Sequence, residues 1–241
     1  MLDFFKNTQG AYFEIYSVWH FLQIAFIVVS VVLIYIFRNN LKSEKNKNLF
    51  LIIGSIILLL NRFIDIFSKL VVGTFDFRLN LPLHFCLITD VLFAVMILFK
   101  KPKMFSFVYF FALIGPLPAI IFPQDSTFFD TYQFWENMLS HHFLIILNFY
   151  ALFVCEYTVL KNDYKITAIL GNIIFFVMIV FNAIWNTNYI FSNTLPDIVL
   201  STFPFIQIFY HPIFWLELCG IVVIYLAYLP VKAIKEVESP N

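Results

Sequence analysis

Seven apolar runs, each about twenty residues long, dominate this sequence of 241 residues. A helix needs about twenty apolar residues to cross the hydrocarbon core of a bilayer. The runs are Ser17–Phe37, Leu49–Val72, Leu81–Phe99, Met104–Phe122, Leu139–Leu160, Ile166–Tyr189 and Tyr210–Leu229. No Gly/Ser-rich linker or low-complexity tract separates them. We therefore predict an all-α polytopic membrane protein, a seven-transmembrane-helix bundle that forms a single domain over residues 1–241.

The composition excludes the classes of protein that must face water. Only 12% of the residues are charged, whereas a soluble domain usually has about 25%. The chain therefore lacks the polar surface of a soluble, disordered, collagen-like or nucleic-acid-binding protein. The 3 cysteines lie in apolar stretches without Cys-x-x-Cys spacing, which argues against a disulfide framework or a zinc knuckle. No small-residue cleavage site follows the first run, so we interpret that run as a retained span and not as a signal peptide.

Basic residues gather in alternate loops and predict the orientation. The loops after the first, third, fifth and seventh runs contain Arg38, Lys42, Lys45, Lys47, Lys100, Lys101, Lys103, Lys161, Lys165, Lys232 and Lys235. The opposite side has only Lys6 and Arg78, with Lys69 near the end of the second run. Since basic loops stay cytoplasmic, we predict that the N-terminus lies outside and the C-terminus lies in the cytoplasm.

Polar side chains within the runs are concentrated in the predicted outer half of the membrane. Ionisable groups at that depth are costly, and each is therefore a candidate functional residue. The charged members are Arg62, Asp65, Asp90 and Glu217. The uncharged members are His20, Asn61, His84, Cys86, His141, His142, Asn148, Asn182, Asn186 and His211. Together they predict a polar cavity that opens outward.

Helical spacing groups some of these residues. Cys86 and Asp90 are four apart and share a helix face, while Arg62 and Asp65 are three apart and can form an ion pair. That pair fits a structural role or a lipid-phosphate site equally well. His141, Asn148 and Cys155 fall on one stripe, and His142 is rotated about 100° from it. Gly115-Pro116-Leu117-Pro118 must break the fourth helix, because each proline removes a hydrogen-bond donor.

Cys86 follows features that favour a helix start. Asn80 is a good cap residue, and Pro82 suits a first helical turn. Cys86 is therefore predicted about one turn into a helix, near its positive end. A nearby imidazole would make its thiol a nucleophile. The simpler alternative is a cysteine that acts as a small apolar side chain.

The stretch Leu81-Pro82-Leu83-His84-Phe85-Cys86 resembles the YwaF-like bacterial integral membrane proteins, whose animal relatives include the transmembrane protein 164 acyltransferase. The resemblance covers most of the chain, including Phe110–Pro123, the Ser140-His141 pair and the segment from Asn182 to Tyr189. It implies a seven-helix protein of the bacterial plasma membrane that transfers fatty acyl chains between phospholipids. It also implies that Cys86 matches the proposed nucleophile, and it favours His141 over His142 as the base.

These observations lead to a preferred hypothesis and two alternatives. In the preferred one, Cys86 attacks a phospholipid acyl ester, His141 is the general base and then acid, and Asp90 or Asp65 orients His141. The predicted substrate-binding residues are His20, Asn61, Arg62, Asp65, His84, His142, Asn182 and Asn186, with Asn182 or Asn186 donating to the oxyanion and Arg62 holding the phosphate.

The first alternative is a transporter or ligand-binding protein for a small solute, whose carboxylates Asp65, Asp90 and Glu217 handle protons. The second is a metal site made of His84, Cys86 and His141, which is less favoured because the first two side chains diverge along the helix. We expect no metal and no cofactor, and membrane phospholipids as partners.

Overall fold

The computed structural model describes residues 2–5, 14–123, 131–160 and 162–238, and they are helical without a strand. The α-helices are α1 (Val18–Leu41), α2 (Glu44–Val72), α3 (Phe77–Asn80), α4 (Phe85–Leu98), α5 (Phe105–Ile114), α6 (Pro116–Ile121), α7 (Tyr132–Asn137), α8 (Leu144–Phe153), α9 (Asp163–Trp185), α10 (Asp197–Thr202) and α11 (Pro212–Glu238). A π-helical turn, η3 (Met138–Phe143), joins α7 to α8. The shorter 3-10 turns are η1 (Leu2–Phe5), η2 (Pro102–Met104), η4 (Tyr189–Phe191) and η5 (Pro204–Phe209).

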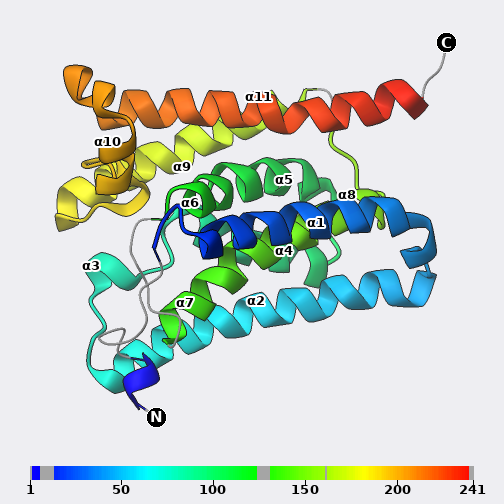
Figure 1. Ribbon diagram of the computed structural model, residues 1–241, viewed down its shortest axis with the longest axis horizontal. Helices are drawn as coiled ribbons and strands as arrows, with labels where there is room; N and C mark the ends of the chain where they lie inside the picture. The colour runs from blue at the N-terminus through cyan, green and yellow to red at the C-terminus, as the bar shows by residue number, and fades with distance from the viewer. Residues whose placement is uncertain (1, 6–13, 124–130, 161, 239–241) are drawn as a thin grey trace.

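Several of these helices are long and apolar enough to cross a membrane. Among the described residues, 5 meet that standard: Val18–Leu41, Asn46–Val72, Pro102–Ile121, Asp163–Trp185 and Pro212–Leu229. The other two predicted spans correspond to α4, which has 14 residues, and to the broken helix α7–η3–α8. The long helices run along the same axis and indicate a multi-pass membrane protein (Figure 1).

The core of the bundle is α5. Within the window Pro102–Ile121, 56% of the residues are buried, against 6% for Pro212–Leu229 on α11. Helix α5 packs against α4, α8, α9 and α11 and lies between them in Figure 1. Outer helices such as α1 expose apolar residues along their length, as expected of helices whose outer faces contact lipid. Lipid-facing helices therefore surround one mostly buried helix.

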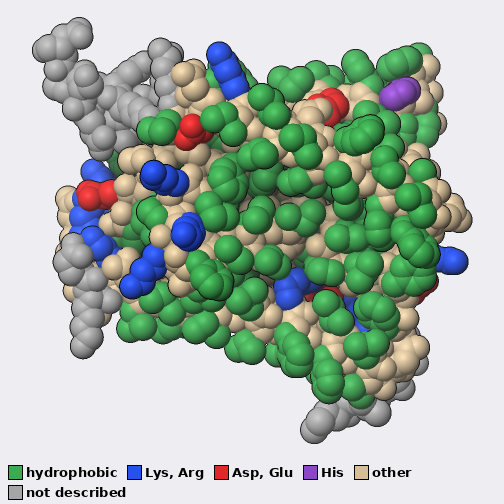
Figure 2. Space-filling view, turned by 180° about the vertical axis from the view of Figure 1, so that it is seen from behind, with side chains coloured by type: hydrophobic (Ala, Val, Ile, Leu, Met, Phe, Trp, Pro, Cys, Tyr) green, Lys and Arg blue, Asp and Glu red, His purple; other side chains and the backbone are tan. Residues whose placement is uncertain are grey.

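Charged side chains mark one end of the bundle, where α1 ends and α2 begins. We call this the basic end, and in Figure 2 the blue side chains gather there, at the left of the view. The opposite end, which contains residues 73–84 and 186–211, we call the loop end (left in Figure 1). Two residues of the predicted charge pattern, Lys6 and Lys161, lie outside the described residues, as do the side chains of Lys45, Lys232 and Lys235.

The structure corrects the predicted start of the third span. Helix α3 ends at Asn80, and Leu81 is extended (φ −70°, ψ 146°), because a following proline disfavours the helical conformation. The next helix begins at Phe85 with His84 as its N-cap. Asn80 is therefore not its cap, and the helix starts four residues later than Leu81.

The predicted break in the fourth span is confirmed, while the fifth span is shifted. Helix α5 ends at Ile114 and α6 begins at Pro116. The predicted fifth span, Leu139–Leu160, begins too late and ends too late, since the helical segment runs from Tyr132 to Phe153. The residues that precede Leu139 include Glu136, a charge that the sequence places in a loop and the structure buries.

Candidate functional site

A cavity of about 1060 Å³ runs from the loop end into the bundle. It is lined by parts of α2, α4, α6, α7, η3, α9 and α11. Several of the predicted site residues contribute to its wall: Arg62, Asp65, His84, Cys86, His141 and His142. The polar residues that the sequence singled out are thus partly brought together, in one cavity.

Cys86 is the second residue of α4 and lies closer to the helix start than predicted. The N-cap residue, His84, is extended (φ −74°, ψ 150°) and its side chain makes no capping bond. The first N–H groups of a helix lack intrahelical acceptors and carry a partial positive charge. Cys86 therefore lies at the positive end of the α4 dipole.

Gly115 sets the position of Cys86 from the other side. A Cβ atom at Gly115 would lie 2.7 Å from the backbone N of Cys86 and 3.2 Å from its Cα. Only glycine permits this approach, because the contact is with backbone, which cannot rotate away. The break between α5 and α6 thus lies directly against the residue that carries the thiol.

His141 lies on the π-helical turn η3, which packs against α2, α4, α6 and α8. Its Nδ1 lies 3.0 Å from the carbonyl oxygen of Asn137. Since a carbonyl only accepts, Nδ1 carries the proton of the neutral ring, and Nε2 is left with a lone pair. Nε2 is buried and has no hydrogen-bond partner among the described residues. Single π turns in α-helices are frequent at functional sites, and this one contains a buried, unprotonated imidazole nitrogen on a residue that lines the cavity.

His84 has the opposite arrangement of its ring nitrogens. The backbone N–H of Ile190 donates to His84 Nδ1 at 3.3 Å. The proton of the neutral ring is therefore on Nε2, which makes His84 a donor. The ring packs against Tyr189 and Phe191, with centroid distances of 5.3 Å and 5.0 Å. The cavity wall thus contains one imidazole that offers a proton and one that accepts a proton.

A buried ionic cluster lies beside these residues, with Arg62 at its centre. Its guanidinium forms an ion pair with Glu136 and lies 3.6 Å from both Asp65 and Asp90. The carboxylate of Asp65 also binds Lys69 at 2.8 Å. Asp90 is fully buried, and neither of its oxygens has a hydrogen-bond partner among the described residues. The predicted pair Arg62–Asp65 is confirmed as one part of this larger cluster.

Ser140 and Asn61 complete the cluster and were assigned no charge-binding role from the sequence. Arg62 Nη2 donates to Ser140 Oγ at 2.6 Å, and Ser140 Oγ donates to Glu136 Oε1 at 2.8 Å. Asn61 donates to the Glu136 carbonyl oxygen and to Ser140 Oγ, each at 3.2 Å. Sequence reasoning missed Glu136. The signal that it lies within a helix is the spacing of four between Glu136 and Ser140, which puts them on one helix face.

Three predicted binding residues, His20, Asn182 and Asn186, do not line the cavity. The Nε2 of His20 lies 2.8 Å from the Ile120 carbonyl oxygen and joins α1 to α6. Asn182 donates to the Tyr189 carbonyl oxygen and to Ser192 Oγ, each at 2.8 Å. Asn186 ends α9 in the left-handed conformation (φ 52°, ψ 53°). The two asparagines shape the turn that carries η4.

The orientation of His141 also differs from the prediction. The Asn137 carbonyl contacts its ring, whereas Asp90 and Asp65 both face Arg62. His141 lies in the π turn and Asn148 in α8, where its side chain donates to the Tyr109 carbonyl oxygen at 3.3 Å. The wider π turn changes the phase of the helix between these two residues.

His142 is buried at the cavity wall, and neither ring nitrogen has a hydrogen-bond partner among the described residues. Glu217 on α11 lines the cavity as well. Within the described part of the chain, no group of three His, Cys, Asp or Glu side chains has the geometry to hold a metal ion. The arrangement therefore offers a thiol at a helix start, a basic imidazole and a donor imidazole.

Comparison with known proteins gives one match. The model of the TMEM164 family matches residues 15–228. No curated protein and no solved structure matches the chain.

Proposed function

The chain belongs to the TMEM164 family, and from this premise we propose that it is a membrane-embedded acyltransferase that moves fatty acyl chains between phospholipids. The observation that carries the proposal is the presence of Cys86 and the unpartnered His141 Nε2 on one cavity wall. We also propose that the chain is related to the YwaF-like bacterial members, as its sequence resemblance suggests. In this proposal it has seven transmembrane spans, and its basic end faces the cytoplasm of a bacterial cell.

The first half of the reaction transfers the acyl group to the enzyme. His141 Nε2 takes the proton of the Cys86 thiol, and the sulfur attacks the carbonyl carbon of the acyl ester. The C–S bond forms as the C–O bond breaks, and His141 returns the proton to the leaving oxygen of the lysophospholipid. The product is a thioester on Cys86, and no redox change takes place.

The second half reverses these steps with a new acceptor. His141 removes the proton from the hydroxyl group of a second lysophospholipid, whose oxygen attacks the thioester and releases the thiol. The oxyanion formed in each half needs hydrogen-bond donors. The available donors are His84 Nε2–H and the N–H groups of the first turn of α4, in place of the predicted Asn182 and Asn186.

The ionic cluster serves as the support for this site. Arg62 connects α2, α4 and η3 through Asp65, Asp90 and Glu136. It therefore fixes the helix that carries Cys86 relative to the turn that carries His141. Asp90 acts on the reaction through this positioning, and Lys69 and Arg78 at the cavity wall offer charge to a lipid phosphate.

The test is acyl transfer by the purified protein. A phospholipid with a fluorescent acyl chain is incubated with a lysophospholipid acceptor. We expect transfer that Cys86→Ser abolishes and that His141→Ala lowers by about a hundredfold or more. Cys155→Ser is the matched control, because Cys155 lies beyond α8 and outside the cavity. Trapping of an acyl thioester on Cys86 by mass spectrometry identifies the intermediate. Transfer at the unchanged rate in both site variants would refute the mechanism.

A second candidate function is transport of a small solute. Glu217 on α11 favours it, because this carboxyl lines the cavity and has no ion-pair partner among the described residues. Carboxylates at membrane depth carry protons in many carriers. Counterflow of a solute in proteoliposomes that Glu217→Gln or Asp90→Asn abolishes, with no acyl transfer, would favour this function over the first.

A further inference from the structure

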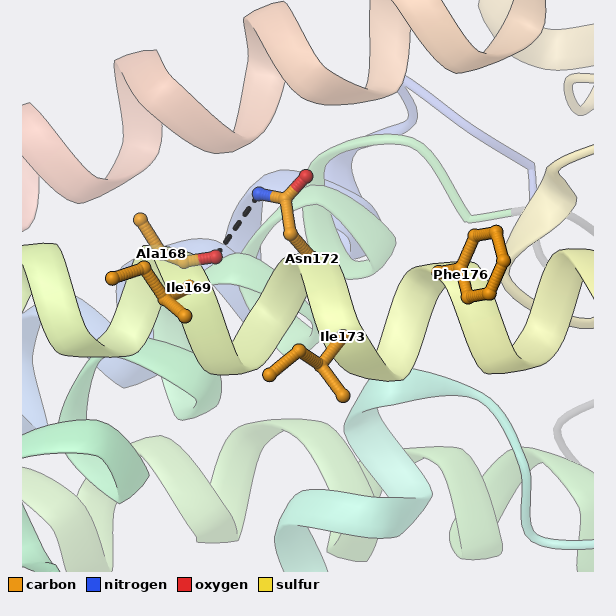
Figure 3. Close-up of a pocket in the computed structure, with 5 residues that line it drawn as sticks. All are labelled: Ala168, Ile169, Asn172, Ile173 and Phe176. Carbon is orange, nitrogen blue, oxygen red and sulfur yellow. Dashed lines mark hydrogen bonds between the residues drawn. The ribbon is translucent and has the colours of Figure 1, made fainter.

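A shallow groove on the outer face of α9 is joined to the cavity. The groove has a volume of about 450 Å³ and is lined by Ala168, Ile169, Asn172, Ile173 and Phe176. In Figure 3, Asn172 points toward α11, and its Nδ2 donates to the Ala168 carbonyl oxygen at 3.0 Å. Ala168 and Asn172 also line the large cavity. The groove therefore adjoins the cavity on the side of α9 where Asn172 points toward α11.

Small residues keep this passage open. A Cβ atom at Gly220 on α11 would meet nothing within 4 Å, and one at Gly171 on α9 would meet only Phe111 Cε1, at 3.5 Å. Both glycines line the cavity, as does Cys219. A side chain larger than that of glycine would therefore find room at both positions.

The size and charge of the passage fit one lipid chain. Along α11 the lining runs from Trp215 to Leu226, which at the helical rise of 1.5 Å a residue is about 16 Å. One leaflet of a bilayer core contributes about half of 30 Å. Apart from Glu217, the residues along this length are mostly apolar, whereas Lys69 and Arg78 line the cavity at the loop end. A cavity with cationic residues at one end and a mostly apolar lining along the rest complements a phospholipid better than a small polar solute.

We propose that the cleft between α9 and α11 is a lateral entry that takes one acyl chain of a membrane phospholipid, with the phosphate at Lys69 and Arg78. This inference rests on the proposed function, since it supplies the acyl donor to Cys86 from the bilayer. Asn172 marks the mouth of the entry. A polar side chain on a lipid-facing surface is unfavourable unless it serves such an opening.

The experiment measures lipid occupancy without catalysis. Full-length Cys86→Ser protein is placed in nanodiscs of phosphatidylcholine that contain a trace of phosphatidylcholine with a diazirine on its acyl chain. Photolabelled peptides are then mapped by mass spectrometry. We expect labels in residues 167–175 and 216–226, and we expect Gly220→Trp to lower this labelling by about fivefold or more, because the indole fills the cleft. Leu229→Trp is the matched control on the same helix, since Leu229 is exposed outside the cavity.

A second measurement needs no substitution in the cleft. Cys219 is an exposed free thiol at the cavity wall. Added phosphatidylcholine is expected to slow the alkylation of Cys219 by a maleimide in detergent, and not that of Cys155. Labelling that Gly220→Trp leaves unchanged, or alkylation of Cys219 that phosphatidylcholine leaves unchanged, would overturn the proposal. Labelled cleft peptides in a protein without acyl transfer would refute the enzyme and support the entry, whereas acyl transfer without cleft labelling would refute only the entry.

Discussion

The two walls of the cavity are built by different physical means. The ionic wall, formed by α2, α4 and η3, is held by Arg62, which is 6% exposed, and by its carboxylate partners. The apolar wall, formed by α9 and α11, has glycines that meet little or no neighbouring structure. Buried ion pairs fix geometry but tolerate little displacement, whereas apolar contacts with gaps permit movement. One wall is thus suited to positioning reactive groups and the other to passage of lipid.

The largest expected effect comes from breaking the ionic wall. Arg62→Met leaves three buried carboxylates with Lys69 as their remaining cation, and removing one partner of a buried pair costs about 3–5 kcal/mol. We expect the free energy of unfolding to fall by that amount, as measured by thermal or denaturant unfolding in detergent. Arg38→Ala is the control, because Arg38 lies outside the ionic cluster and its guanidinium contacts the carbonyl oxygen and the ring of Tyr35. Equal stability of the two variants would contradict the central role of Arg62.

A smaller effect is expected where the break between α5 and α6 contacts the ionic wall. Gly115→Ala would place a methyl group 2.7 Å from the Cys86 backbone N. Overpacking of this kind costs about 1–3 kcal/mol, and it also displaces Cys86. We therefore expect lower stability together with a lower rate of acyl transfer. Gly220→Ala should change neither quantity, because a Cβ atom there meets open space. Equal losses of stability and of acyl-transfer rate in Gly115→Ala and Gly220→Ala would contradict the proposed difference in packing between the two walls.

At the loop end of the apolar wall, the turn after α9 is held by hydrogen bonds to Asn182. Besides its two donated bonds, its Oδ1 accepts from Thr187 Oγ1 at 2.5 Å and from the Tyr189 N–H at 3.0 Å. Asn182→Ala leaves these groups without their partner, and we expect a loss of about 1–2 kcal/mol in the free energy of unfolding. The same substitution at the exposed Asn172 should leave stability unchanged. Unfolding curves of the two variants measure the difference in their free energies of unfolding. A greater loss of stability in Asn172→Ala than in Asn182→Ala would contradict the prediction.

The smallest effect is expected from an ion pair that faces water. Lys42 Nζ lies 2.6 Å from Glu156 Oε1, and this hydrogen bond and the lysine charge hold the pKa of Glu156 below its ordinary value. Because the folded pKa is lowered, the contribution of the pair is present above the unfolded pKa and is lost as the pH falls through the folded pKa. Lys42→Ala should return the Glu156 pKa to its ordinary range with no measurable change in unfolding. A ¹³C NMR titration of the glutamate carboxyl groups measures the shift, and an unshifted Glu156 would show that the pair does not form.

The sequence predicted the helical membrane class and the outline of the site because both depend on local pattern. The length of an apolar run predicts a membrane span, and the prolines of the Gly115–Pro118 segment predict a break in a helix whatever surrounds it. The spacing of Arg62 and Asp65 predicts a pair that needs only one helix. Cys86 and His141 were singled out for the same reason, since each is a reactive side chain within an apolar run.

What the sequence did not predict depends on contacts between distant segments. The sequence places Glu136 in a loop, whereas the structure buries it in an ion pair with Arg62, which lies 74 positions earlier in the chain. Asn182 was predicted to face the cavity, but the segment that follows α9 folds back, and Thr187, Tyr189 and Ser192 form hydrogen bonds with its side chain. The ring of His141 was assigned a carboxylate partner, and the structure supplies a backbone carbonyl from its own helix.

The π turn η3 makes the site sensitive to the number of residues in this part of the chain. A π turn holds about one more residue than an α turn over a similar rise, so deletion of one residue within Met138–Phe143 would restore a regular helix. Every side chain before the deletion would then rotate by about 100° relative to α8. Glu136 would leave Arg62, and the Asn137 carbonyl would leave the imidazole that it orients. Deletion of one residue at this turn is therefore expected to disrupt the site more than most single substitutions within it.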